Sequence, residues 1–178
     1  MRAAVALTGL LAALALAGDT VRTEAVGLRF AVPAGWMRTP AASDVRAAQW
    51  RVPATGPDED GEVVLFYFGR GKGGGTEENL QRWYAQFTEP DGRTAHDAAV
   101  LTVRTVNGLR VSEVDLTGTY QPPPMMGGGP PRPGTRLLAA IVEGGDGPWF
   151  FKALGPAATM ERAKPGFDAM LASLEPHR

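Results

Sequence analysis

Two stretches of this chain are apolar at consecutive positions, a pattern that a strand with one solvated face does not show. Residues 62–68 are Glu-Val-Val-Leu-Phe-Tyr-Phe, and residues 137–142 are Leu-Leu-Ala-Ala-Ile-Val. Side chains on a strand alternate between two faces, so each stretch places apolar groups on both faces. Both stretches are therefore expected to be strands inside a sheet that is covered on its two sides.

A tight hairpin is indicated in the middle of the chain. Residues 100–106 and 109–120 are both strand-like, and Asn107 and Gly108 separate them. Asn-Gly suits the two-residue type I′ turn, in which both central residues need a positive φ. We therefore expect these two stretches to pair directly with each other as antiparallel strands.

The second arm of this hairpin carries two apolar pairs that point in opposite directions. Leu109 and Val111 share one face of a regular strand, whereas Val114 and Leu116 share the other. One core cannot receive both pairs from a regular strand, so a bulge or bend is predicted near residues 112–113.

Two amphipathic helices are predicted. The first begins at Thr76, which is expected to cap it, and ends before Pro90. Its apolar stripe at helical spacing comprises Leu80, Trp83, Tyr84 and Phe87. The second helix covers residues 158–174, and Pro165 within it is expected to kink or restart the helix.

The order of these elements predicts the fold class. Further short strands are expected over residues 28–32, 49–52 and 149–154. Successive strands joined by hairpins make an antiparallel sheet, and the helices must bury their apolar stripes against it. We therefore predict an α+β fold in which an antiparallel β-sheet is flanked by helices, as an α/β/α sandwich.

Residues 121–134 interrupt this pattern. The stretch contains six prolines and four glycines, so it lacks backbone donors and is costly to order. It is predicted to form neither strand nor helix.

Three short stretches resemble the PsbP-like fold family. They are Phe-Ala-Val-Pro-Ala-Gly-Trp at residues 30–36, Phe-Phe-Lys at residues 150–152, and Phe-Asp-Ala-Met-Leu-Ala-Ser-Leu at residues 167–174. That family includes an extrinsic photosystem II protein and a nuclear-import factor that binds the small GTPase Ran. The resemblance implies protein–protein binding without catalysis, and it implies no particular partner.

The first residues indicate export. Arg2 precedes an uncharged Ala/Leu stretch that ends in small residues, as a signal peptide does. The stretch is too short to cross a bilayer, which needs about 20 apolar residues. We predict a signal peptide over residues 1–17, cleavage before Gly18, and one domain over residues 18–178 that works in the periplasm or outside the cell. A plain secretory leader argues against a photosynthetic role.

Composition excludes several classes of function. The chain has no cysteine, which rules out disulfides, thiolate metal sites and a cysteine nucleophile. The net charge of −1 argues against nucleic-acid binding, which needs a concentrated basic surface. The sequence contains no run of basic residues that would indicate a patch for binding a membrane surface. We therefore expect no stable membrane anchor after the signal peptide is cleaved.

Few residues suggest metal or cofactor chemistry. His96 stands beside Asp97, but no further ligands accompany the pair, and His177 lies near the end of the chain. Met125 and Met126 are a poor copper site without a nearby histidine. The sequence therefore predicts no metal, no cofactor and no assigned catalytic residue.

Lys152 is the most unusual charged residue, because it lies on a predicted strand among aromatic residues. Such a lysine either extends its amine to a sheet edge or pairs with a buried acid. An enzyme whose site is assembled from scattered residues around Lys152 and His96 is the alternative to a binding protein. An envelope structural protein without a discrete ligand is a third hypothesis.

Partner binding is the function that we predict, with another protein as the partner. Proline pre-orders the 121–134 segment, and aromatic, methionine and arginine side chains are enriched at interfaces. The alternative for this segment is a tolerated insertion without a role. The predicted contact residues are Tyr120, Met125, Met126, Arg132, Arg136 and Lys152.

Overall fold

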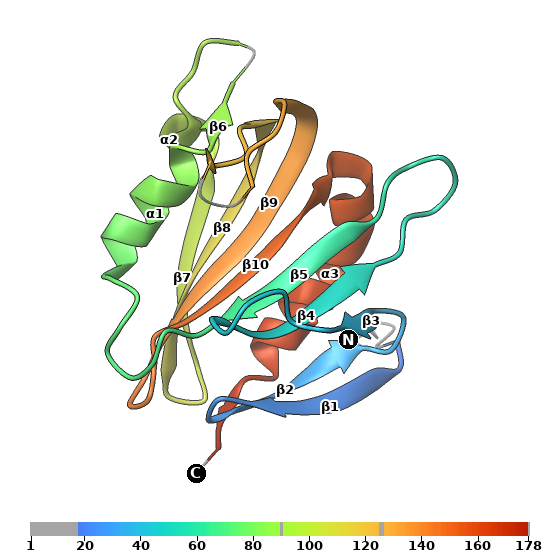
Figure 1. Cartoon of the computed structure of the whole chain (residues 1–178). Coiled ribbons are helices and arrows are strands. Elements are labelled where there is room, and N and C mark those ends of the chain that lie inside the picture. Colours follow the sequence, from blue (N-terminus) through green and yellow to red (C-terminus); the bar gives the residue numbers. More distant parts are fainter. Residues whose placement is uncertain (1–17, 90, 125–126, 178) are drawn as a thin grey trace, which may run out of the picture.

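The computed structural model describes residues 18–89, 91–124 and 127–177. The predicted signal peptide, Met125 and Met126 lie outside these residues. The elements, in chain order (Figure 1), are β1 (Thr20–Ala25), β2 (Leu28–Pro33), β3 (Met37–Thr39), β4 (Arg46–Val52), β5 (Gly61–Phe66), α1 (Thr76–Tyr84), β6 (Phe87–Thr88), α2 (Ala95–Ala98), β7 (Val100–Val106), β8 (Leu109–Tyr120), β9 (Arg132–Glu143), β10 (Trp149–Pro156), α3 (Ala157–Ala172) and β11 (Glu175–Pro176).

The strands form one large and one small sheet, and every pairing is antiparallel. The large sheet has the order β3-β4-β5-β10-β9-β8-β6, with β7 also paired to β8. The small sheet has the order β1-β2-β11. The two strands that are apolar on both faces, β5 and β9, each lie between two other strands, as predicted from their composition.

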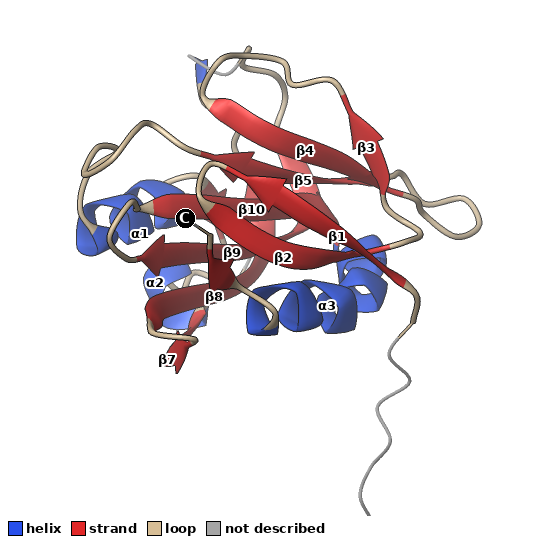
Figure 2. Ribbon diagram, turned by 90° about the horizontal axis from the view of Figure 1, so that it is seen from below, coloured by secondary structure: helices blue, strands red, loops and turns tan. Residues whose placement is uncertain are grey.

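Two separate cores cover the two faces of the large sheet. On one face, Trp83 of α1 belongs to the same core as Ile141 and Phe150 of the sheet. On the other face, Phe30 of the small sheet and Phe167 of α3 share a core with sheet residues. Helices α1 and α3 therefore lie on opposite sides of the large sheet (Figures 1 and 2). The predicted α+β sandwich is confirmed, and the small sheet shares the covering of one face with α3.

The hairpin forms at Asn107 and Gly108, whose φ angles are 47° and 83°. The bulge predicted near residues 112–113 is wrong, because β8 pairs in regular register with both neighbours there. The reason is that β8 is covered on both faces. Val111 is buried in the core beside α3, and Val114 is buried in the core beside α1.

The irregular segment after β8 is shorter than predicted, because β9 already begins at Arg132. Tyr120 pairs with Arg132 and Gly118 pairs with Thr135, so residues 133–134 lie opposite a single residue of β8. Such a bulge tolerates a proline, which has no backbone N–H for the ladder.

Helix α1 also ends earlier than the apolar stripe predicts. It stops at Tyr84, and Phe87 instead belongs to β6 and pairs with Tyr120. The N-cap is Gly75, not Thr76, and the side-chain amide of Asn79 donates to the Gly75 carbonyl.

Helix α3 continues through Pro165 without a restart. Among the residues that the structure describes, no helix has the length and apolar character needed to cross a membrane.

Candidate functional site

Lys152 is placed on the α1 face of the large sheet by the alternation of β10. Phe150 belongs to the α1-side core, whereas Phe151 belongs to the α3-side core, so Lys152 again points to the α1 side. Its cross-strand neighbours are Val64 and Ala139, whose side chains are shorter than that of lysine. Lys152 is 8% exposed, which is unusual for a lysine.

Among the residues that the structure describes, the Lys152 amine has no acidic partner. Its Nζ donates a 2.6 Å hydrogen bond to Oε1 of Gln86 and lies 5.4 Å from the centre of the Tyr120 ring. No carboxylate of the described residues lies within 4.0 Å of it. Neither predicted arrangement of this lysine is found. The amine does not reach a sheet edge and does not pair with a buried acid; it donates to the neutral side-chain amide of Gln86 instead.

Burial lowers the pKa of Lys152 to about 8, from an ordinary 10.5. Burial is the largest cause of this lowered pKa; the positive charge of Arg46 contributes to the lowering, and the negative charge of Glu62 opposes it. Burial also raises the pKa of Tyr120. The amine is thus mostly protonated at pH 7, but its charge is poorly compensated.

A cavity of about 160 Å³ opens beside the amine. Its charged lining consists of Arg46, Glu62, Arg132 and Lys152, and Tyr120 forms part of the wall. Arg46 and Glu62 form an ion pair of 3.0 Å. Arg132 is exposed and makes no ion pair within the described part of the chain. The cavity therefore carries an excess of positive charge.

A second cavity, of about 130 Å³, also lies beside Lys152, and its polar lining consists of Asn79, Arg82, Gln86 and Lys152. Its aromatic lining comprises Phe66, Phe68, Trp83 and Phe150. Phe66 and Lys152 line both cavities. Lys152 thus lines both the cationic cavity and the aromatic cavity.

The structure brings together three of the predicted contact residues, Tyr120, Arg132 and Lys152. Arg136 lies on the opposite side of the sheet, where its guanidinium donates to Asp115 at 2.7 and 2.8 Å and also bonds to Glu161 of α3. These bonds raise the pKa of Arg136, and the Asp115 bond is the main cause.

His96 does not join this site. It lies on α2, where its Nδ1 is 3.2 Å from Asp97 and its ring contacts the Tyr84 ring edge-on at 5.5 Å. It lines neither cavity beside Lys152. Within the described ranges, no group of three or more His, Asp or Glu side chains is arranged to hold a metal ion.

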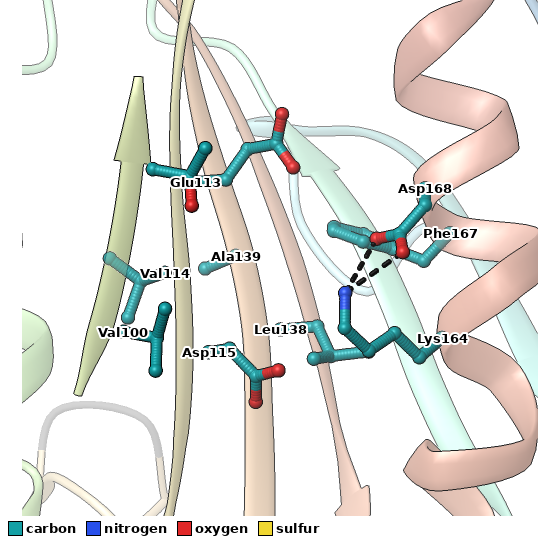
Figure 3. A pocket seen from close by; sticks show the side chains of 10 residues that line it. Val100, Glu113, Val114, Asp115, Leu138, Ala139, Lys164, Phe167 and Asp168 are labelled. Carbon is teal, nitrogen blue, oxygen red and sulfur yellow. Dashed lines mark hydrogen bonds and ion pairs between the residues drawn. The ribbon is translucent and has the colours of Figure 1, made fainter. Parts of the chain in front are cut away.

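A different cavity lies between β8 and α3 (Figure 3), and its charged groups are paired. Lys164 bonds to both oxygens of Asp168, at 2.9 and 2.8 Å. Asp115 is paired with Arg136, and Glu113 with Arg104. Each charged side chain that lines this cavity already has a partner of opposite charge, whereas the cavity beside Lys152 has positive charges that are unpaired among the described residues.

Sequence reasoning missed three residues that shape the site, Arg46, Glu62 and Gln86. Arg46 lies on β4 and Glu62 on β5, and Gln86 follows the end of α1. None of them stands out in the sequence, because polar residues at strand ends and after helices are common. The strand order places Arg46 and Glu62 beside Lys152, and the end of α1 places Gln86 there.

Comparison with known proteins identifies the fold. No protein-family model matches the chain, and no curated protein matches it. The solution structure of cyanobacterial PsbP from Synechocystis sp. PCC 6803 is similar over 96% of this chain and 99% of that chain, with a TM-score of 0.54 and 17% identity. A Pseudomonas aeruginosa protein of unknown function is similar over 90% of this chain and 99% of its own, with a TM-score of 0.52 and 13% identity. The chain therefore has a PsbP-like fold, as the sequence resemblance predicts.

Proposed function

We propose that this chain is an exported, non-catalytic accessory protein that binds another protein through the Lys152 face. This face is defined by Arg46, Glu62, Phe66, Tyr120, Arg132 and Lys152. Cyanobacterial PsbP and the Pseudomonas protein share the fold, which is compatible with an accessory role and names no activity. The predicted signal peptide supports export.

The observation that carries this proposal is the buried, uncompensated charge of Lys152. A buried charge without an ion pair costs stability, so a lysine at this position is unfavourable for folding. Residues that break local rules in this way are expected at functional sites. The open cationic cavity beside the amine offers a place for a partner's group.

The surroundings of the cavity have the character of an interface. Tyr120 and Arg132 are residue types that are enriched at binding surfaces. Pro122 and Gly128 of the adjoining proline-rich segment also line the cavity, so this segment forms one of its walls. A partner seated there contacts both the sheet and the segment.

Co-purification with charge-reversed variants tests the proposal. Arg132→Glu places an acid at the mouth of the cavity, and Arg22→Glu makes the same change at an exposed position of β1 in the small sheet. We expect Arg132→Glu to lose the partners that wild type retains from its native host, and Arg22→Glu to keep them. Equal partner sets for both variants would place the interaction elsewhere.

A reaction at Lys152 is the alternative, and one observation favours it. Five ionisable groups converge in one cavity, and a lysine with a pKa of about 8 is a candidate amine nucleophile. Such an amine forms an imine with a carbonyl compound, and borohydride traps the imine as a stable adduct. An adduct on wild type that is absent from Lys152→Met would favour the enzyme over the binding protein.

A further inference from the structure

The charges at the Lys152 face indicate which kind of chemical group binds there. Two positive charges there lack a paired acid among the described residues, the Lys152 amine and the exposed Arg132 guanidinium. The acid of this cavity, Glu62, is already bonded to Arg46. A group with a negative charge is therefore the complement of the cationic cavity.

The aromatic cavity adds a second requirement. Phe66, Phe68, Trp83 and Phe150 offer an apolar space of about 130 Å³, which suits one apolar side chain. Because Phe66 and Lys152 line both cavities, a ligand that fills both carries its negative group close to its apolar group.

The last residue of a polypeptide has this arrangement when its side chain is apolar. Its α-carboxylate and its side chain leave the same Cα, and the rest of the chain continues outward. Capture of a terminal carboxylate is a recurring mode of peptide recognition. An internal acidic residue carries its carboxylate on its own side chain, so its apolar group has to come from another residue.

We propose that the Lys152 face binds the C-terminal residue of a partner protein, with the α-carboxylate beside Lys152 and Arg132 and an apolar side chain in the aromatic cavity. This inference rests on the proposed function, because it names the part of the partner that enters the site. Gln86, which now accepts a hydrogen bond from Lys152, holds the amine in position for the carboxylate.

Binding of two matched peptides tests the inference. Both are N-terminally labelled with fluorescein and have the sequence Gly-Ser-Gly-Ser-Gly-Phe; one ends in a free carboxylate and the other in a carboxamide. Fluorescence anisotropy with the whole protein at pH 7 gives their affinities. We expect the carboxamide to bind about thirtyfold more weakly or worse, since it carries no negative charge to compensate the buried ammonium group.

Variants locate the binding. Lys152→Met, which keeps an unbranched side chain, and Arg132→Ser are each expected to weaken binding of the free acid, whereas Arg22→Ser on β1 leaves it unchanged. Equal affinities for acid and amide, no binding of either peptide, or full affinity in Lys152→Met would each overturn the inference. Free 3-phenylpropionate, added as a competitor, distinguishes the source of the carboxylate. If it binds as tightly as the peptide, the site takes small acids and the polypeptide assignment is wrong.

Failure of this inference is distinguishable from failure of the proposed function. If Arg132→Glu loses its co-purifying partners while the acid and amide peptides bind alike, the Lys152 face is still the interaction surface. In that case only the assignment of the bound group as a C-terminal carboxylate is wrong.

Discussion

The Lys152 amine and the Gln86 amide, 66 positions apart in the chain, are joined by a hydrogen bond of 2.6 Å. Gln86 follows α1, and its own carbonyl accepts a 2.7 Å bond from the backbone N–H of Gln121. One residue thus links the end of α1, the end of β8 and the buried lysine. A neutral partner orients the amine but does not cancel its charge, which leaves that charge available to an incoming anion.

Lys152→Met is expected to change how stability depends on pH. The pKa of Lys152 is about 8 in the folded protein and 10.5 in an ordinary setting, so the folded state binds fewer protons between these values. Stability of the wild type, measured relative to Lys152→Met, therefore rises as the pH increases from about 8 to 10.5.

The size of this change is up to about 3 kcal/mol, from the difference between the two pKa values. Urea denaturation of both proteins at several pH values measures it. A free-energy difference between the two proteins that is the same at pH 7 and pH 10 would show that the amine is not buried as described.

The hairpin turn depends on a glycine at position 108. Gly108 has a φ of 83°, which a β-branched residue adopts only with strain. Gly108→Val is expected to lower the free energy of unfolding by more than about 1 kcal/mol. Gly145→Val is the control, because Gly145 lacks a positive φ and a Cβ added to it would meet no atom within 4 Å. Equal thermal melts for the two variants would contradict the tight turn.

Arg136 is expected to stabilise the fold. Its side chain is 13% exposed and bonds to Asp115 and Glu161, so Arg136→Ala leaves Asp115 without its partner. We expect a loss of about 2–4 kcal/mol. Lys164→Ala breaks a more exposed ion pair with Asp168 and should cost less than about 1 kcal/mol. If thermal denaturation shows the two losses to be similar, the Arg136 pair is not structurally important.

The proline-rich segment provides a test that is independent of charge. Residues 122–131 can be replaced by a short Gly/Ser linker that leaves Tyr120 and Arg132 in the strand pair. We expect an unchanged melting temperature and weaker binding of the partner, because the segment lines the cavity. Retention of all partners with an intact fold would show that the segment is a tolerated insertion.

Strand patterns predicted the sheet well because its signals are local. Residues 62–68 and 137–142 are apolar on both faces, and this property alone predicts a covered sheet. The hairpin at Asn107 is equally local, since the turn chemistry sits in two residues. The prediction of a bulge in β8 failed because it assumed a single core, whereas β8 separates two cores.

The site was only partly predictable, because its members meet through long-range pairing. Lys152 is conspicuous as a charge among aromatic residues. Its partner Gln86 is not, and the end of α1 that positions Gln86 was predicted too late in the chain. Arg136 looked equivalent to Arg132 in the sequence. Arg132 and Arg136 lie on opposite faces of the sheet, because the bulge at residues 133–134 changes the strand alternation and places Arg136 against α3.

Affinity for the carboxylate peptide should depend on pH. The amine must be protonated to pair with the carboxylate, and a bound carboxylate favours that form. Affinity is therefore expected to be constant below about pH 8 and to fall above it, by about tenfold per pH unit. The other ionisable groups that line the two cavities beside the amine are Arg46, Glu62, Arg82, Tyr120 and Arg132. An affinity that does not change between pH 7 and pH 9.5 would exclude Lys152 as the charged partner.

The ionisation of Lys152 itself tests the central claim most directly. The lysines of the chain are Lys72, Lys152 and Lys164, so 13Cε-labelled lysine gives a simple NMR spectrum, and Lys152→Met assigns the resonance. We predict that this resonance titrates near pH 8 in the free protein, and at least about one unit higher with the carboxylate peptide but not with the carboxamide. A titration near the ordinary pKa of 10.5, or one that the carboxylate peptide does not move, would contradict the account.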